Sequence, residues 1–196
     1  MGAYNTKSKG IKIFFTQSLR KFIKNGSLIP SSKYLGNMML KNVIMRPNVI
    51  VAELGAGTGA FTNMILSKMP KNGKLLVFEI NPVLVKHIQI KIVDPRVTII
   101  KDDAINIKTH LQKIQVKKPD YIISSIPIGN MTRTARKLLL LTIYDCLNDN
   151  GLFIQFQYFL ASLLPVRKIF KTSIVGYEYR NMPPAFVYNC RKKSTN

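Results

Sequence analysis

The sequence predicts an α/β fold built on a doubly wound, mostly parallel sheet, and three observations indicate it. Short apolar runs alternate with segments of helical periodicity, such as the one carrying Leu138, Leu141 and Asp145. The first apolar run leads into a glycine-rich turn. A length of 196 residues fits one domain with a sizeable core. Strands are expected at about 49–53, 75–78, 96–100, 120–125, 151–156 and 185–188, and helices at about 58–69, 81–91 and 132–147.

The first strand ends in an acid and three alternate glycines. Glu53 is followed by Gly55, Gly57 and Gly59. Glycine is needed where the backbone bends sharply and approaches a bulky ligand that a Cβ atom would meet. No lysine follows Gly59, so the turn differs from a phosphate-binding loop, which requires Gly-Lys-Ser/Thr. The third glycine also comes one residue too early for the G-x-G-x-x-G turn of dinucleotide-binding enzymes.

A second acid ends the next apolar run. Glu79 lies 26 positions after Glu53, where a carboxylate can accept hydrogen bonds from a ribose diol. Together with this acid, the motif E-L-G-A-G-T-G resembles motif I of class I S-adenosylmethionine-dependent methyltransferases, which have a Rossmann-like fold. The resemblance implies S-adenosylmethionine as the cofactor and S-adenosylhomocysteine as the product. It implies that the cofactor contacts Glu53, Gly55, Ala56, Gly57 and Gly59 in the turn, Glu79 at the ribose, and Asp103 with Ala104 at the adenine.

The composition is strongly basic. Thirty Lys and Arg residues against 9 Asp and Glu give a net charge of +21, which indicates a polyanionic partner, either nucleic acid or an anionic membrane surface. A genomic bias toward Lys, Ile and Asn is the alternative explanation. Cys146 and Cys190 form no metal-binding spacing and no disulfide framework, so a reducing compartment and no metal site are expected. No apolar run of membrane-spanning length and no signal peptide is visible.

The N-terminal segment predicts an amphipathic helix. Its apolar residues form one stripe, and Lys and Arg residues lie on or beside the opposite face. This pattern fits an interfacial helix on an anionic membrane, and equally a helix that packs on the domain. We therefore expect a membrane-contacting segment at residues 1–35 and a methyltransferase domain at residues 36–196. The stripe consists of Ile11, Phe15, Leu19, Phe22 and Ile23.

Five blocks of the sequence look like successive blocks of bacterial phospholipid N-methyltransferases. The likeness runs from about residue 10 to the end, and its specific parts are the Pro-Ser-Ser block and the Arg-Asn-x-Pro-Pro-Ala block. It implies methylation of phosphatidylethanolamine toward phosphatidylcholine, and relatives in this group methylate ornithine lipids. A departure is Gln157, which stands where a smaller hydroxyl residue is usual and leaves the exact headgroup open. The blocks are residues 25–35, 53–62, 124–127, 155–158 and 180–188.

The ribosomal RNA adenine dimethyltransferase family is the alternative. It shares a similar motif I and a basic composition, but its members carry Asn-Leu-Pro-Tyr after the fourth strand, where the amide and the ring bind a flipped base. This chain has Ser125-Ile126-Pro127-Ile128 there, and we expect no added helical C-terminal domain of the kind used on RNA. Lipid methylation is therefore favoured over RNA methylation, and a nucleic-acid partner is not expected.

The lipid-methyltransferase resemblance implies further site residues. Arg180 would bind the lipid phosphate, because a guanidinium matches two phosphate oxygens, and Asn181 would orient it or cap the turn. The amine attacks the sulfonium methyl in line after losing a proton to bulk water, to a carboxylate, or to a phenol such as Tyr34 or Tyr158. Tyr158, Tyr177 and Tyr179 would face a quaternary product. The cofactor set also includes Ser31, Ser32, Ile80 and Ser124.

The remaining expectations concern setting and alternatives. We expect a monomer in the cytoplasm, peripherally associated with the inner face of the cytoplasmic membrane. His87 and His110 are expected in a helix and in a surface connection, outside the site. A non-enzymatic basic domain that binds the cofactor, or coats a membrane or RNA, is the third interpretation.

Overall fold

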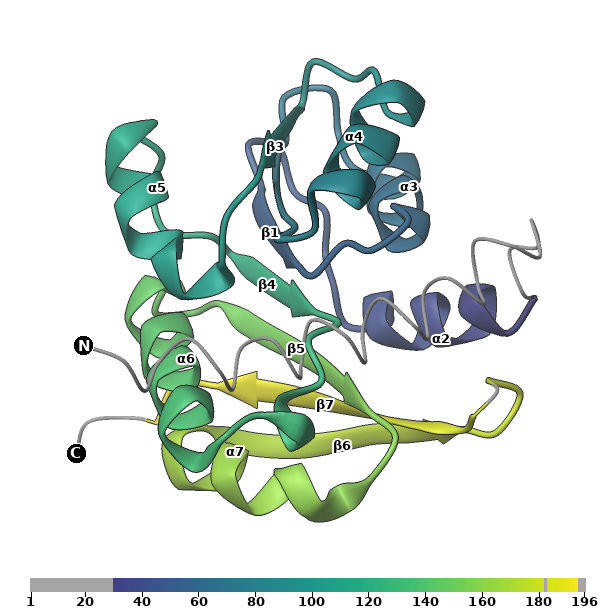
Figure 1. Cartoon of the computed structure of the whole chain (residues 1–196), viewed down its shortest axis with the longest axis vertical. Coiled ribbons are helices and arrows are strands. Elements are labelled where there is room, and N and C mark those ends of the chain that lie inside the picture. Colours follow the sequence, from purple (N-terminus) through teal and green to yellow (C-terminus); the bar gives the residue numbers. More distant parts are fainter. Residues whose placement is uncertain (1–29, 182, 194–196) are drawn as a thin grey trace.

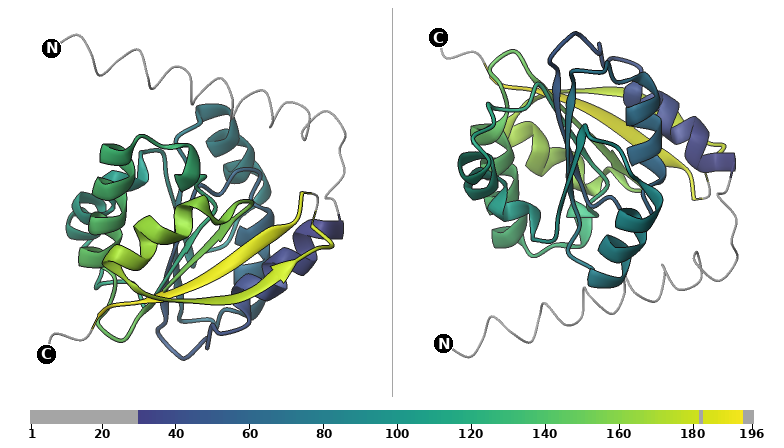
Figure 2. Two further views of the ribbon diagram at one scale, coloured as in Figure 1. Left: turned by 90° about the horizontal axis from the view of Figure 1, so that it is seen from below. Right: turned by 90° about the horizontal axis from the view of Figure 1, so that it is seen from above.

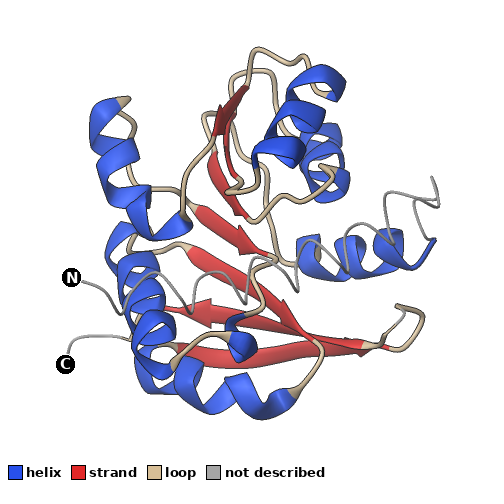
Figure 3. Cartoon of the chain, in the orientation of Figure 1, coloured by secondary structure: helices blue, strands red, loops and turns tan. Residues whose placement is uncertain are grey.

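The computed structural model describes residues 30–181 and 183–193, which form a seven-stranded sheet with helices on both faces (Figures 1 and 3). The strand order is β3-β2-β1-β4-β5-β7-β6. The first five strands of that order are parallel, β7 is antiparallel to β5, and β6 is antiparallel to β7. The predicted mostly parallel, doubly wound sheet is confirmed. The strands are β1 Ile50–Leu54, β2 Lys74–Phe78, β3 Val97–Ile100, β4 Tyr121–Ser124, β5 Leu152–Gln157, β6 Lys171–Glu178 and β7 Ala185–Arg191.

Helices cover both faces of the sheet (Figure 2), and an apolar layer fills the space between the helices and the sheet on each face. One layer joins the sheet to α2, α3 and α4, and the other joins it to α5, α6 and α7. Strand β1 is buried almost throughout, which explains its unbroken apolar run. The helices are α2 Pro30–Leu40, α3 Ala60–Lys68, α4 Pro82–Lys91, α5 Ile107–Lys113, α6 Arg133–Cys146 and α7 Leu163–Ile169, with single 3₁₀ turns at Ala104–Asn106, Ile128–Asn130 and Leu160–Ser162.

Helix α2 packs against the sheet and against α3. Its Leu35 and Met39 side chains are buried in the layer that contains α3 and α4. Gly36 faces α3 so closely that a Cβ atom there would overlap the Met64 side chain. The expected boundary at residue 35 falls inside this helix. The predicted interfacial helix at residues 9–24 lies outside the described residues.

The predicted strands and helices match the structure within a few residues, and α2, α5, α7 and β6 were not predicted. In α6 the residues whose spacing indicated the helix do not form its buried face, because Leu138 and Leu141 are exposed. The buried stripe contains Leu139, Leu140 and Ile143 instead. Four leucines stand in a row at 138–141, so helical spacing alone fits either face.

No helix in the described part of the chain is long and apolar enough to cross a bilayer.

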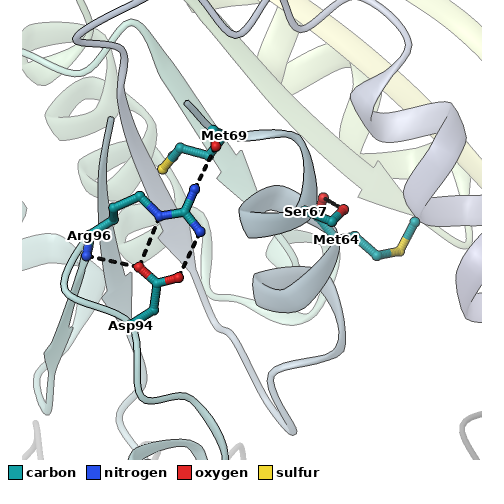
Figure 4. Close-up of polar contacts among 5 residues, drawn as sticks. All are labelled: Met64, Ser67, Met69, Asp94 and Arg96. Atoms are coloured by element: carbon teal, nitrogen blue, oxygen red, sulfur yellow. Dashed lines mark hydrogen bonds and ion pairs between the residues drawn. The ribbon is translucent and has the colours of Figure 1, made fainter. Parts of the chain in front are cut away.

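Arg96 ties β3 to the end of α3 (Figure 4). Its guanidinium binds the Asp94 carboxylate through two N–H groups, with N···O distances of 2.9 and 2.6 Å, and donates a third bond to the Met69 carbonyl. The hydrogen bond from Arg96 is the main reason that the pKa of Asp94 falls to about 2. This cluster lies at the start of β3, which is the edge strand at the opposite end of the sheet from β6.

We expect Arg96→Met to lower the free energy of unfolding by about 1 to 2 kcal/mol, because the variant keeps the aliphatic stem and loses all three polar contacts. Urea unfolding at neutral pH measures the change. Lys101→Met, which removes an exposed cation, is the matched control and should change stability by less than about 0.5 kcal/mol. Equal stability of the two variants would contradict a stabilising role for Arg96.

Candidate cofactor and substrate site

The glycine turn follows β1 at the edge of the sheet where the parallel strands end, which we call the carboxyl edge. The amides of Gly55 and Ala56 donate to the Phe78 carbonyl and hold the turn against β2. Gly57 has φ of 61°, a backbone conformation that favours glycine. A Cβ atom on Gly57 would meet nothing within 4 Å, so this side of the turn faces open space. The turn is therefore shaped to admit a ligand along its backbone.

Glu79 lies at the end of β2 and supports the same turn. One carboxylate oxygen accepts the Gly57 N–H and the other accepts the Asn81 N–H, both at 2.8 Å. Burial raises the pKa of Glu79, and these backbone hydrogen bonds partly offset the rise. Each oxygen keeps a lone pair, so the carboxylate can still accept a hydroxyl of the ligand.

Glu53 is completely buried on β1. Its Oε2 atom accepts a 2.6 Å hydrogen bond from the Thr62 hydroxyl of α3, while Oε1 has no partner among the described residues. Burial, with a smaller contribution from the Glu79 charge, raises the pKa of Glu53 to about 7. A buried acceptor without a hydrogen bond destabilises the folded protein. A cationic ligand that bound near Glu53 Oε1 would remove this cost. Thr62 was not predicted as part of the site.

The segment after β3 lies at the same edge. Asp103 is exposed and accepts the Ile105 N–H, so its carboxylate shapes the turn, and Ala104 is buried. The neighbouring Asp102 binds the His110 ring at 2.8 Å, and that ring packs edge-on against Phe78. His110 is therefore part of α5 and partly buried, which corrects its expected place in a surface connection.

Of the other predicted cofactor residues, Ser124 and Ile80 lie at this edge, and Ser31 and Ser32 lie in α2. Ser124 is buried, and its hydroxyl accepts the Ile126 N–H at 3.2 Å. Ile80 is half exposed beside Glu79, and Ser31 and Ser32 belong to the first turn of α2. The open face of the turn, the unpaired Glu53 oxygen and the acid at the ribose position together fit S-adenosylmethionine. In the described ranges no three His, Cys, Asp or Glu residues lie together as metal ligands would.

The loop after β4 is fixed by two glutamines of β5. The side-chain amides of Gln155 and Gln157 both donate to the Ile126 carbonyl at 3.0 Å. The Gln157 oxygen also accepts the Gly129 N–H. Sequence reasoning treated Gln157 only as a departure and missed Gln155, although two amides in an otherwise apolar strand are a usable signal.

Arg180 forms an ion pair that the sequence analysis did not predict. Its Nε and Nη2 atoms bind the buried Glu178 carboxylate at 2.8 and 3.0 Å, and this hydrogen bonding lowers the pKa of Glu178. The guanidinium also lies 3.9 Å from the Tyr34 ring centroid and 5.6 Å from that of Tyr179. Among the described residues, Nη1 and the outer Nη2 hydrogen have no hydrogen-bond partner, and they form a second donor edge for an anion. A cleft of about 250 Å³ opens here, lined by Tyr34, Asn37, Met38, Lys41, Val175, Glu178 and Arg180.

Tyr158 and Asn181 stand beside this cluster. The Asn181 amide donates to the Pro183 carbonyl at 2.6 Å and so holds the turn between β6 and β7. Burial raises the pKa of Tyr158, and a hydrogen bond with Asn181 partly offsets the rise. A phenol with a raised pKa keeps its proton at neutral pH, which disfavours Tyr158 as the proton acceptor. The structure thus gathers Tyr34, Tyr158, Arg180 and Asn181 near the ends of β5 and β6.

Comparison with known proteins agrees with this geometry. The family model described as "Ribosomal RNA adenine dimethylase" matches residues 19–150, which is about two thirds of the chain. The chain belongs to this family. Its cofactor is S-adenosylmethionine and it is a class I methyltransferase, as the sequence predicted.

Two curated relatives differ in their substrates. The ornithine lipid N-methyltransferase of Singulisphaera acidiphila is 26% identical over 88% of this chain and 93% of its own length. The probable ribosomal RNA small subunit methyltransferase A of Methanosphaera stadtmanae is 30% identical over 53% of this chain, which spans 35% of that protein.

A solved structure shares the fold over nearly the whole chain. The 1,6-didemethyltoxoflavin-N1-methyltransferase of Burkholderia thailandensis, solved with S-adenosylhomocysteine, superposes with a TM-score of 0.73 at 13% identity. The match covers 99% of this chain and 92% of that one.

Glu53→Gln should stabilise the cofactor-free protein more at pH 8 than at pH 5. The pKa of Glu53 is raised from 4.5 to about 7, so the native state keeps a proton that the unfolded state loses, and stability falls across this window as pH rises. Glutamine does not titrate, so the gain should reach up to about 3 kcal/mol. Urea unfolding at both pH values measures it, with Asp145→Asn, at an exposed carboxylate, as the control. A gain that is equal at both pH values would contradict this account.

Proposed function

We propose that the protein is an S-adenosylmethionine-dependent N-methyltransferase acting on the headgroup amine of a membrane aminolipid. Ornithine lipid is the first candidate substrate. The observation that carries the proposal is the likeness to an ornithine lipid N-methyltransferase over 88% of this chain and 93% of that relative. The ribosomal RNA relative matches a little over half of this chain.

The loop after β4 supports a lipid over an adenine base. At residues 125–128, where RNA adenine dimethyltransferases carry Asn-Leu-Pro-Tyr, it has neither the amide nor the aromatic ring that bind a flipped adenine. The Ile126 carbonyl already accepts two glutamine N–H groups, so both of its lone pairs are engaged. An aryl amine would have to displace one of these bonds to use that oxygen.

The free donor edge of Arg180 supports a substrate that carries an anion near its amine. Its two remaining parallel N–H directions match the carboxylate of an ornithine headgroup. They match a phosphate equally well, which makes phosphatidylethanolamine the second candidate. The ion pair with Glu178 holds the Arg180 guanidinium in place, so its second donor edge is oriented before the lipid binds.

The mechanism is a direct displacement for which the chain supplies position. The nitrogen lone pair of a neutral amine forms the new N–CH₃ bond as the S–CH₃ bond breaks, which leaves a thioether and a protonated secondary amine. The cofactor supplies the electrophilic methyl group. Arg180 would fix the headgroup, and the Gln155 and Gln157 amides keep the β4 loop rigid beside it. The ring faces of Tyr34 and Tyr179 lie against the Arg180 guanidinium, so these two rings help to position Arg180.

We also propose that the protein works as a monomer at the inner face of the cytoplasmic membrane. The net charge of +21 supports attraction to an anionic leaflet. The phosphate backbone of a ribosomal RNA would be attracted by the same charge, so the substrate has to be identified directly.

Incubation with labelled S-adenosylmethionine should place the label in lipid. Parallel reactions contain ornithine lipid, phosphatidylethanolamine or unmodified ribosomal RNA, and thin-layer chromatography separates the products. Label that runs with methylated ornithine lipid is the expected result. Label confined to RNA would overturn the proposal, and label in phosphatidylethanolamine alone would transfer it to the second candidate.

Arg180→Lys should reduce kcat/KM on lipid substrate tenfold or more, which corresponds to about 1.4 kcal/mol. Lysine can keep the charge beside Glu178 but cannot offer a second donor edge to the anion. The Kd for S-adenosylmethionine, measured by titration calorimetry, should stay unchanged. Arg46→Lys, at an exposed site before β1, is the matched control. Full activity of Arg180→Lys would remove Arg180 from the substrate site.

A further inference from the structure

Three exposed apolar side chains follow β5 directly. Phe159 is 77% exposed, Leu160 45% and Leu164 70%, and we call these residues the Phe159 patch. Phe159 and Leu160 lie in the connection between β5 and α7, and Leu164 lies in the first turn of α7. This connection can be followed in Figure 1. Single exposed apolar residues are ordinary, but a group within six positions indicates a contact surface.

Helix α7 places cations around this patch. Its inner face buries Leu163 and Val166 against the core. Its outer face carries Leu164 with Arg167 and Lys168, three and four positions later, and all three are exposed. Apolar side chains flanked by Lys and Arg have the chemistry that the headgroup boundary of an anionic bilayer binds.

The patch adjoins the candidate substrate site. Tyr158, whose ring packs edge-on against Phe156, immediately precedes Phe159. Strand β6 runs in the same direction as β5, so Tyr177 and Tyr179, both at least half exposed, lie at the same edge of the sheet. Aromatic residues of this kind favour the interface between water and lipid.

We propose that the Phe159 patch inserts into the headgroup and acyl boundary of an anionic bilayer, with Arg167 and Lys168 bound to lipid phosphates. The inference rests on the proposed function and names the surface through which it operates. Charge complementarity supports this occupant, because the chain carries +21 overall and two exposed cations flank the patch. Docking in this way turns the carboxyl edge toward the membrane, so a headgroup amine reaches the site while its acyl chains stay in the bilayer.

The chain contains no tryptophan, so a single Phe159→Trp variant of the full chain reports on the patch alone. With vesicles of phosphatidylglycerol and phosphatidylcholine, its emission should shift to the blue and be quenched by lipids brominated on the acyl chains. Val93→Trp is the matched control, since Val93 is 91% exposed beyond α4 on another part of the surface, and its emission should not change. Unchanged emission of Phe159→Trp would overturn the proposal. A spectrum that is already blue without vesicles would also overturn it, because residues 1–29 or a second copy would then cover the patch.

A paired substitution tests the energetic contribution. Phe159→Ser with Leu164→Ser should weaken sedimentation with the same vesicles tenfold or more, equivalent to about 1.4 kcal/mol. Ile90→Ser with Val93→Ser removes two apolar side chains that are 72% and 91% exposed elsewhere, and binding should change less than twofold. Urea unfolding checks that both double variants are folded. Undiminished vesicle binding of the first pair would overturn the proposal, as would a dimer that dissociates on the same substitution.

These measurements need no methyl transfer, so the two proposals fail separately. Insertion of Phe159→Trp without methylation of any lipid would overturn the proposed function and leave the docking surface standing. Methylation of a short-chain, water-soluble aminolipid by a protein whose Phe159→Trp variant stays in water would overturn the docking surface alone.

Discussion

The two hydrogen bonds that Glu79 accepts are the interaction on which the candidate cofactor site depends. One comes from Gly57 in the turn after β1, and the other comes from Asn81, which caps α4. A single carboxylate therefore joins the ends of two strands and the start of a helix. The hydrogen bond from the Gly57 N–H to Glu79 holds the Gly57 backbone in its left-handed conformation, with the open side of the turn facing away from the protein. Removing the carboxylate would free two backbone N–H groups at once.

Keeping two acids buried in so basic a chain has an energetic cost. Burial raises the pKa of both Glu53 and Glu79, and the charge of Glu79 adds to the rise at Glu53. The Lys and Arg side chains at the surface are exposed to water, so solvent screening weakens their ability to stabilise the charged form of these buried acids. A cationic cofactor held by these residues would offset this cost. The cost of burying the two acids in the free protein would then contribute to cofactor affinity, as is usual for buried acids at a functional site.

Local patterns made the first half of the molecule predictable, whereas pairings between distant residues did not. The unbroken apolar runs of β1 and β2 and the spacing of Gly55, Gly57 and Gly59 are fixed by neighbours in the sequence, and the fold followed from them. Strand β6 was missed because it is the outermost strand and its exposed residues do not form an apolar run. The contacts from Gln155 and Gln157 to Ile126 span about 30 positions, so no local pattern contains them. In contrast, Glu178 lies two residues before Arg180, and this pair could have been inferred.

The residues predicted for the cofactor and those proposed for the lipid lie on different strands of one sheet, so a single small domain has room for both ligands. Strands β1, β2 and β3 lead into most of the residues predicted for the cofactor, while β5 and β6 end in the residues proposed for the lipid. Strand β4 lies between the two groups, and its loop is held from the β5 side by Gln155 and Gln157. A change in the β5 amides can therefore reshape the space for the accepting nitrogen without disturbing Glu79 or the glycine turn. In this chain the residues predicted for the cofactor and those proposed for the substrate lie on different halves of the same edge, so the substrate residues can vary while the glycine turn and Glu79 stay the same.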